Sequence, residues 1–134
     1  MMTESDSGYR RRWAVLALVL AAECIDLLDG SIVNVAAPTI RNDLHASTAA
    51  LQWIISGYAL AFAIGLLTGA RLGDRYGRKR LFVAGSASFA AASLAAALSV
   101  SPAMLIGCRL AQGAAAALLI PQGLGIIRDV FAPA

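Results

Sequence analysis

Charged residues are scarce in this sequence of 134 residues, at 14%, whereas hydrophobic residues make up 59%. A soluble domain of this size does not combine so few charges with such long apolar runs, which excludes an ordinary soluble fold. The net charge of +3 does not indicate nucleic-acid binding, because the basic residues cluster at the ends of apolar segments. The composition predicts an all-α integral membrane protein, with the lipid bilayer as a partner and no nucleic acid.

Cysteine and histidine are also rare, with two and one residues respectively. Cys24 and Cys108 fall in apolar segments, where free thiols behave as small hydrophobic side chains, and two cysteines do not make a disulfide framework. His45 stands alone in a polar segment, and no spacing of metal ligands occurs in the sequence. We expect neither a metal site nor a cofactor, and we do not expect an enzyme.

Three consecutive arginines, at 10–12, precede an apolar run and resemble the start of a secretory signal peptide. The run continues past Ala22, contains acidic residues and lacks a convincing cleavage site. It therefore predicts an uncleaved first transmembrane helix. Residues 1–12 are expected to form a short, polar cytoplasmic tail in front of it.

Four apolar segments are long enough to cross a hydrocarbon core of about 30 Å. Pro38 is predicted to end the first segment, because proline cannot continue the hydrogen-bond ladder of a helix. A polar linker follows at 41–45, and Ser47 or Thr48 is a suitable N-cap for the second segment. The very short turn at 99–102 makes the third and fourth segments antiparallel neighbours. The predicted spans are residues 13–36, 49–70, 81–100 and 103–127, followed by a cytoplasmic loop at 128–134 that looks truncated.

Arginine and lysine lie almost entirely on one side of these spans. Of the eleven in the sequence, Arg41 alone falls on the other side and Arg109 lies inside a span. Because the basic residues of short loops stay in the cytoplasm, both ends of this chain and the 71–80 loop are predicted to be cytoplasmic, in a multi-pass protein of the cell membrane. The nine residues on that side are Arg10, Arg11, Arg12, Arg71, Arg75, Arg78, Lys79, Arg80 and Arg128.

The second span has a small residue at every fourth position, which places a stripe of small side chains on one helix face. Such a stripe allows the backbone of a neighbouring helix to approach closely. Trp53 and Tyr58, near the start of this span, are expected at the membrane interface, where amphipathic rings are favoured. The stripe consists of Gly57, Ala61, Gly65, Gly69 and Gly73.

The first span carries three acidic residues, Glu23, Asp26 and Asp29. At about 100° per residue, the three acids and Asn34 fit in an arc of roughly 140°. An ionised acid near the centre of a bilayer costs at least a few kcal/mol, so three on one face need a reason. They predict either a protonatable stripe that faces a water-filled cavity or a set of structural pairs with polar groups of other helices.

The fourth span contains Arg109, with Gln112 and Gly113 on the same face. Because arginine does not lose its proton, a membrane-embedded arginine needs a counter-charge, and an acid of the first span is the expected partner. Protonation of that acid would release the arginine and so couple a proton to helix movement. The alternative is a static buried pair that orders the bundle.

The basic segment at 71–80 contains Asp74 among five cations. Gly73 and Gly77 bracket Asp74 and Arg75, which predicts a tight turn with a close approach of backbones. The alternative is a topology anchor without further function. The candidate residues of this segment are Arg71, Gly73, Asp74, Arg75, Gly77, Arg78 and Lys79.

Three of these stretches resemble the major facilitator superfamily, and more narrowly its fourteen-helix drug:proton antiporter branch. Residues 28–38 read LDGSIVNVAAP and are similar to the first-helix pattern of that branch. Residues 71–80 read RLGDRYGRKR and resemble the cytoplasmic loop motif of the superfamily, with Ala70 where the leading glycine is usual. Residues 109–113 read RLAQG and are similar to the arginine-x-x-glutamine-glycine motif of proton-coupled exporters.

The resemblance implies roles for these residues. Asp29 would be the embedded acid linked to proton or substrate binding, and Arg109 with Gln112 would take part in proton coupling. A conformational latch between helix bundles would consist of Asp74, Arg75 and Arg78. Glu23 and Asp26 lie outside the motif, so their role rests only on the helix face that they share with Asp29.

The family fold has two six-helix halves, and this sequence would supply the first four spans of one half. We therefore expect a truncated N-terminal portion of a proton-coupled exporter of drug-like molecules, whose remainder would be its partner. Two other classes fit four helices. A small multidrug-type exporter also has an acid on its first helix but lacks the two later motifs and the strong charge bias. A non-transporting assembly protein could use the small-residue stripe to pack on partners.

Overall fold

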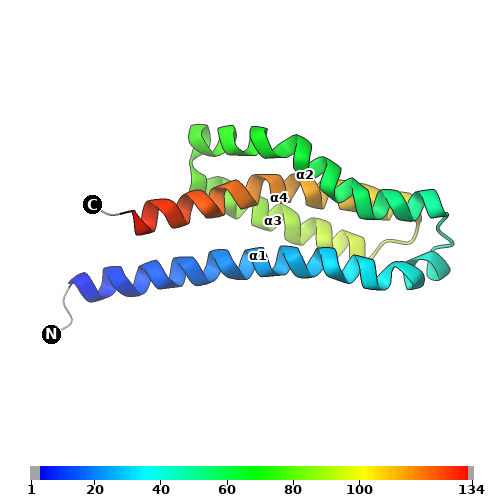
Figure 1. The fold of residues 1–134 in the computed structure, drawn as a ribbon, viewed down its shortest axis with the longest axis horizontal. Coiled ribbons are helices and arrows are strands. Elements are labelled where there is room, and N and C mark those ends of the chain that lie inside the picture. Colours follow the sequence, from blue (N-terminus) through cyan, green and yellow to red (C-terminus); the bar gives the residue numbers. More distant parts are fainter. Residues whose placement is uncertain (1–3, 133–134) are drawn as a thin grey trace.

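A computed structural model describes residues 4–132 of the chain and shows an all-α fold. Its four long helices run up and down in chain order, which agrees with the predicted helical class (Figure 1). No strand occurs in residues 4–132. The helices are α1 (Glu4–Asp43), α2 (Thr48–Tyr76), α3 (Arg78–Ala97) and α4 (Pro102–Phe131).

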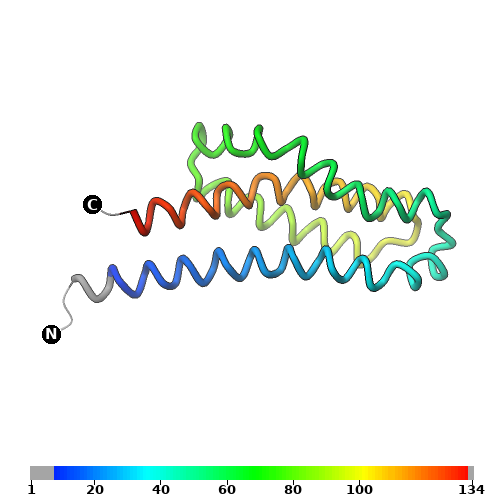
Figure 2. The backbone as a smooth tube through the Cα atoms, in the orientation of Figure 1, coloured from blue at the N-terminus to red at the C-terminus, as the bar shows by residue number. Residues whose placement is uncertain are grey.

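Helix α4 lies at the centre of the bundle and packs mainly on α2 and α3. Helix α1 lies along the side of this group and touches it less closely (Figure 2). A small apolar core consists of Phe89, Ala115 and Ala116, with Tyr58 and Phe62 packed against it. The beginning of α1, the end of α4 and the α2–α3 junction all lie at one end of the bundle, as the predicted topology requires.

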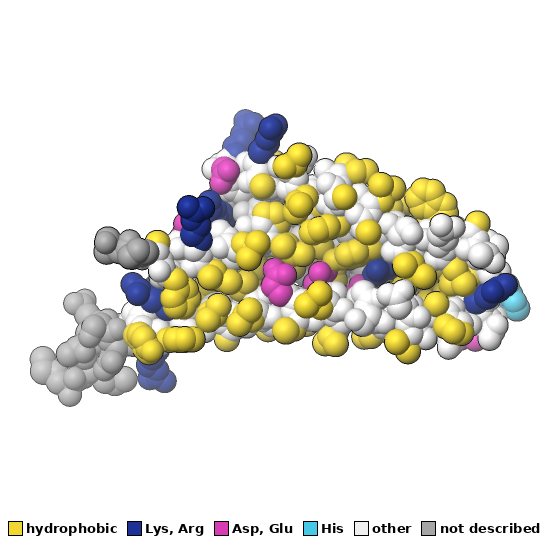
Figure 3. Space-filling view, viewed as in Figure 1, with side chains coloured by type: hydrophobic (Ala, Val, Ile, Leu, Met, Phe, Trp, Pro, Cys, Tyr) yellow, Lys and Arg dark blue, Asp and Glu magenta, His cyan; other side chains and the backbone are white. Residues whose placement is uncertain are grey.

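Helices α2, α3 and α4 are long and apolar enough to cross a membrane, whereas α1 does not meet that criterion. The outer surface is largely apolar: Val35, Leu67 and Val100 are at least 75% exposed. Figure 3 shows acidic side chains in the middle of this apolar face, and most of the lysines and arginines gathered towards the end that holds both chain ends. The apolar part of α1 contains three acidic residues, Glu23, Asp26 and Asp29, which lower its mean hydropathy.

The prediction that Pro38 ends the first helix is wrong. Helix α1 runs from Glu4 to Asp43 with Pro38 inside it, so it also includes most of the predicted tail and the first residues of the predicted linker. One proline removes a single backbone donor and leaves the carbonyl of Asn34 without its helical partner, which a long helix tolerates. The true connection to α2 is short, and the side chain of Ser47 caps α2 by accepting from the backbone N–H of Ala50 at 3.1 Å.

The predicted loop at 71–80 is almost entirely helical. Helix α2 continues to Tyr76 and α3 begins at Arg78, so Gly77 alone joins them, at a φ of 97° that glycine adopts without strain. Helix α4 likewise continues to Phe131, so most of the segment expected to be a loop at 128–134 is helical within the described residues. Helices can extend past the hydrocarbon because water satisfies their outermost backbone groups.

The predicted stripe of small residues on α2 lies against α4. A side chain at Gly69 would overlap the backbone carbonyl of Ala117, and a side chain at Gly73 would overlap the amide of Gln122. The contact is reinforced by Gln122, which is 2% exposed and donates through Nε2 to the carbonyl oxygen of Gly69 at 2.7 Å. The close approach of backbones predicted at Gly73 and Gly77 is not found: Gly73 lies inside α2 against the side chain of Gln122, and a side chain at Gly77 would meet nothing within 4 Å.

Candidate functional site

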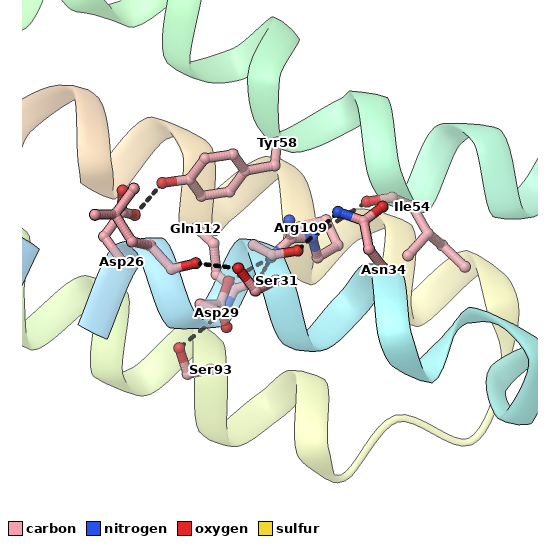
Figure 4. Close-up of polar contacts among 11 residues, drawn as sticks. Asp26, Asp29, Ser31, Asn34, Ile54, Tyr58, Ser93, Arg109 and Gln112 are labelled. Carbon is pink, nitrogen blue, oxygen red and sulfur yellow. Dashed lines mark hydrogen bonds and ion pairs between the residues drawn. The ribbon is translucent and has the colours of Figure 1, made fainter. Parts of the chain in front are cut away.

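Arg109 lies in the centre of the bundle and is only 3% exposed. Its Nη1 donates to Asp29 Oδ2 at 2.5 Å and to Gln112 Oε1 at 3.0 Å, and its Nε donates to the backbone carbonyl of Ile54 at 3.1 Å (Figure 4). The predicted pairing of Arg109 with an acid of the first helix is present, and that acid is Asp29. The guanidinium is thereby held by α1, α2 and α4 at once.

Gln112 completes this network from the next turn of α4 and is 1% exposed. Its Nε2 donates to Asp29 Oδ1 at 3.2 Å and to the hydroxyl of Ser93 on α3 at 2.8 Å. Each carboxylate oxygen of Asp29 therefore accepts one hydrogen bond from α4. All four helices contribute to the site. Ser93 was not predicted to belong to it, because it is one of many serines and alanines in its segment.

Tyr58 is a second residue of the site that was not predicted to belong to it. It was expected at the membrane interface, but it is half-buried beside Arg109, whose guanidinium carbon lies 4.7 Å from the ring centroid. Its hydroxyl donates a hydrogen bond to Asp26 Oδ1 (Figure 4). The signal available in the sequence was its place on α2 three residues before Ala61, which belongs to the stripe that packs on α4.

A cleft of about 420 Å³ opens on one side of Asp29. Its walls come from α1, α3 and α4, and it extends from Asp29, Arg109 and Gln112 towards Asp43 and the end of the bundle that holds the α1–α2 and α3–α4 connections. An ion pair next to a cleft of this size is open to water from one end.

The remaining predicted residues of α1 differ in their surroundings. Glu23 lies beside Gly123 of α4, and its Oε1 is buried without a hydrogen-bond partner among the described residues. Asn34, by contrast, is exposed and donates to the carbonyl of Gly30 in its own helix at 3.0 Å. Glu23, Asp26 and Asp29 thus face the bundle, as the helix periodicity indicated, whereas Asn34 does not take part in the site.

A second polar cluster lies at the α2–α3 junction. Arg78 Nη1 donates to Asp129 Oδ2 at 2.8 Å and to the backbone carbonyl of Gly125 at 3.1 Å. Arg78 Nη2 lies 3.6 Å from Asp74 Oδ1, one helical turn earlier in the chain. This cluster connects the start of α3 with the end of α4 and the end of α2.

The other predicted residues of the 71–80 segment do not join this cluster. Arg71, Arg75 and Lys79 are exposed and form no ion pair within the described part of the chain, although the guanidinium of Arg75 lies 5.5 Å from the ring of Tyr76. Asp129, which completes the cluster, was not predicted because it was assigned to a loop after the fourth span.

Comparison with known proteins extends over nearly the whole chain. The Major Facilitator Superfamily matches residues 10–134. The chain is 54% identical over 125 residues to a probable actinorhodin transporter of Streptomyces coelicolor, an alignment that covers 93% of this chain and 22% of that protein. It is 44% identical over 128 residues to a tetracenomycin C resistance and export protein of Streptomyces glaucescens, covering 95% of this chain and 24% of that protein.

A cephamycin export protein of Amycolatopsis lactamdurans is 45% identical over 121 residues, covering 89% of this chain and 25% of that protein. The chain therefore spans about a quarter of the length of the curated relatives that it matches. The four antiparallel helices and the arginine–aspartate pair between the first and fourth helices are consistent with the match over residues 10–134. This chain belongs to the major facilitator superfamily.

Proposed function

We propose that this chain is the N-terminal part of a proton-coupled exporter of small, drug-like molecules. The observation that carries the proposal is the ion pair of Asp29 with Arg109, which lies inside a bundle with an apolar outer surface. The relatives named above for export of, or resistance to, particular compounds support small organic molecules as substrates. The motifs at 28–38 and 109–113 support the fourteen-helix drug:proton antiporter branch as the finer assignment.

In this proposal, protonation of Asp29 couples the proton to movement. Arginine stays charged, so only the carboxylate of the pair can lose its charge. When Asp29 accepts a proton from water in the cleft, its attraction to Arg109 falls and α1 can move relative to α4. Loss of that proton restores the ion pair and the original packing.

The cluster around Arg78 would act as a latch at the cytoplasmic end. The side chains of Asp74 and Asp129 are 72% and 66% exposed, and ion pairs this exposed contribute about 0–1 kcal/mol each. Contacts this weak can be broken and remade as helices move. We assign the latch to Asp74 and Arg78, as the motif implies, and add Asp129 to it. We assign no latch contact to Arg75.

We further propose that α1 is a fourth transmembrane span. At 1.5 Å per residue its 40 residues measure about 60 Å, twice the hydrocarbon thickness, so only a part near 13–36 would lie in the bilayer. The three acids that lower its hydropathy lie on the face of α1 that contacts α2 and α4. With four spans, both ends of this chain and the α2–α3 junction would lie in the cytoplasm, where their arginines and lysines belong.

This topology can be tested with single cysteines in a chain whose two natural cysteines are replaced by serine. We expect Asn42→Cys, in the exposed last turn of α1, to react with a membrane-impermeant maleimide added outside intact cells. Lys79→Cys, equally exposed at the opposite end of the bundle, should react only after the membrane is permeabilised. Labelling of Asn42→Cys only from the cytoplasmic side would contradict the proposed topology.

The proposed activity can be tested in a chimera in which this chain replaces the matching segment of the Streptomyces coelicolor relative. In inverted vesicles that maintain a proton gradient, we expect addition of actinorhodin to dissipate the gradient, as measured with a pH-sensitive dye. A protonophore should stop the accumulation of the compound. Accumulation that continues unchanged after the gradient has collapsed would show that transport is not driven by protons.

A further inference from the structure

Tyr58 contacts Asp26 and Arg109 at the centre of the bundle and has no role in the function proposed so far. Its ring lies under the guanidinium of Arg109, with 4.7 Å between guanidinium carbon and ring centroid, and its hydroxyl donates to Asp26. A cation over an aromatic face is stabilised by the ring quadrupole. The side chain therefore connects the acid one turn before Asp29 with the cation that Asp29 binds (Figure 4).

The packing of α2 on α4 keeps Tyr58 in this place. A side chain at Gly113 would overlap the backbone carbonyl of Tyr58, so the two helices are in direct contact at this level. One turn earlier, the carbonyl of Ile54 accepts from Arg109, and one turn later the ring of Phe62 stacks on Tyr58 with centroids 6.4 Å apart. These contacts fix the backbone of α2 at Tyr58 relative to Arg109 on α4.

The two aspartates have different surroundings. Asp29 is bound by Arg109 and Gln112 and lines the cleft, whereas Asp26 is bound by the hydroxyl of Tyr58 and does not line it. Asp26 forms no ion pair within residues 4–132. The charged side chains that face Tyr58 are Asp26 and Asp29 on α1 and Arg109 on α4.

A buried arginine needs a counter-charge at every stage of a cycle, because an isolated cation in an apolar interior is strongly unfavourable. If a proton on Asp29 simply released Arg109, the cation would be left unpaired. Asp26 is the next carboxylate on the same face of α1, since residues three apart on a helix are neighbours. Asp26 is also bound by Tyr58, a residue that is itself in contact with Arg109.

We propose that Arg109 exchanges between two carboxylates, Asp29 and Asp26, and that Tyr58 is the positioning residue for the exchange. Asp29 takes one proton from water in the cleft and becomes neutral, while the guanidinium keeps its charge and pairs with ionised Asp26. Tyr58 holds Asp26 through its hydroxyl and supports the moving guanidinium on its ring. This inference rests on the proposed proton-coupled transport.

The test compares Tyr58→Phe with Tyr58→Leu in the chimera. Phenylalanine keeps the ring beneath Arg109 and removes only the hydroxyl, so a role in packing alone predicts no effect. We expect Tyr58→Phe to lower proton-driven export about tenfold, which corresponds to the loss of one hydrogen bond to a charged group, and Tyr58→Leu to lower it further. Tyr76→Phe, an exposed tyrosine on the same helix, is the matched control and should be silent.

The exchange also predicts a specific interaction between two substitutions. Asp26→Asn removes the charge that would receive Arg109, so adding Tyr58→Phe to Asp26→Asn should cause no further loss of export. The effects of two substitutions are not additive when both residues act through one contact, whereas the effects of independent substitutions add. A silent Tyr58→Phe, or full additivity of the two substitutions, would overturn the proposal.

A second measurement does not depend on transport. The measurement uses infrared spectra of the 134-residue chain reconstituted in lipid, with the spectrum of the unmodified chain subtracted from that of each variant. The carboxylate band of Asp26 is the one that disappears in Asp26→Asn. We expect Tyr58→Phe to shift this band and Tyr76→Phe to leave it unchanged. If this band shifts while the chimera shows no proton-driven export, the Tyr58–Asp26 contact holds and the proposed transport fails. If the band does not shift, the role of Tyr58 is wrong whatever the chimera does.

Discussion

Replacing Asp29 by asparagine in the chimera is expected to abolish proton-driven export. Asparagine can still accept a hydrogen bond from Arg109, but its amide carries no charge and does not take up a proton near neutral pH. Removing one partner of a buried ion pair costs about 3–5 kcal/mol, which corresponds to a loss of at least about 100-fold in any step that needs the pair. The measurement is the initial rate of gradient dissipation in inverted vesicles, normalised to the amount of protein in the membrane.

Asp43→Asn is the matched control for this substitution. Asp43 lies on the same helix, lines the far end of the same cleft and is exposed, so the same change of charge there should alter export by less than about twofold, as is usual for surface positions. If Asp29→Asn inserts normally and exports at the rate of the unmodified chimera, the ion pair is a static element of the bundle. The coupling role of Asp29 would then be excluded.

Substituting Gly69 by alanine is expected to destabilise the helix bundle by about 2–4 kcal/mol, even though alanine is the better helix former. The added methyl group would overlap the carbonyl of Ala117, which Pro121 leaves without its helical donor, and would push α2 away from α4. The separation would also break the buried hydrogen bond from Gln122 to the carbonyl of Gly69. Unfolding of the 134-residue chain in mixed detergent micelles, followed by circular dichroism, measures the effect.

Gly107→Ala provides a control with the same chemical change. Gly107 lies inside α4, and a methyl group built there meets no atom of another helix within 4 Å. Alanine should stabilise the helix at that position by about 0.5–1 kcal/mol through its propensity alone. Equal effects of the two substitutions would mean that α2 and α4 are not packed through Gly69, and the central position of α4 in the fold would be in doubt.

The stripe of small residues was predictable because helix periodicity decides which positions share a face. Gly69 and Gly73 recur at the spacing of one turn, so their common face follows from the sequence without knowledge of the neighbour. The identity of that neighbour does not follow. Only the folded bundle shows that α4 supplies it, through the backbone of Ala117 and the side chain of Gln122.

The helix ends were predicted less well than the helix faces. Hydropathy marks where a segment enters lipid, but backbone hydrogen bonding continues into water, so α1 passes through Pro38 and α2 continues to Tyr76. As a result, the basic segment was described as a loop although Gly77 is its only non-helical residue. Asp129 was missed for the same reason, because it was placed in a loop and belongs to the last turn of α4.

Composition and charge were sufficient to establish an all-helical chain with apolar helices and to show that Arg109 needs an acidic partner on another helix. These conclusions follow from solvation, since apolar runs and an unpaired buried cation have the same energetic consequences in any arrangement of helices. The choice of Asp29 among three acids, and the entry of Tyr58 and Ser93 into the site, depend on how α1 is rotated and how far it is shifted along α4. Rotation and shift come from contacts between residues distant in the chain, such as Gly113 against the backbone of Tyr58, and no local pattern contains them.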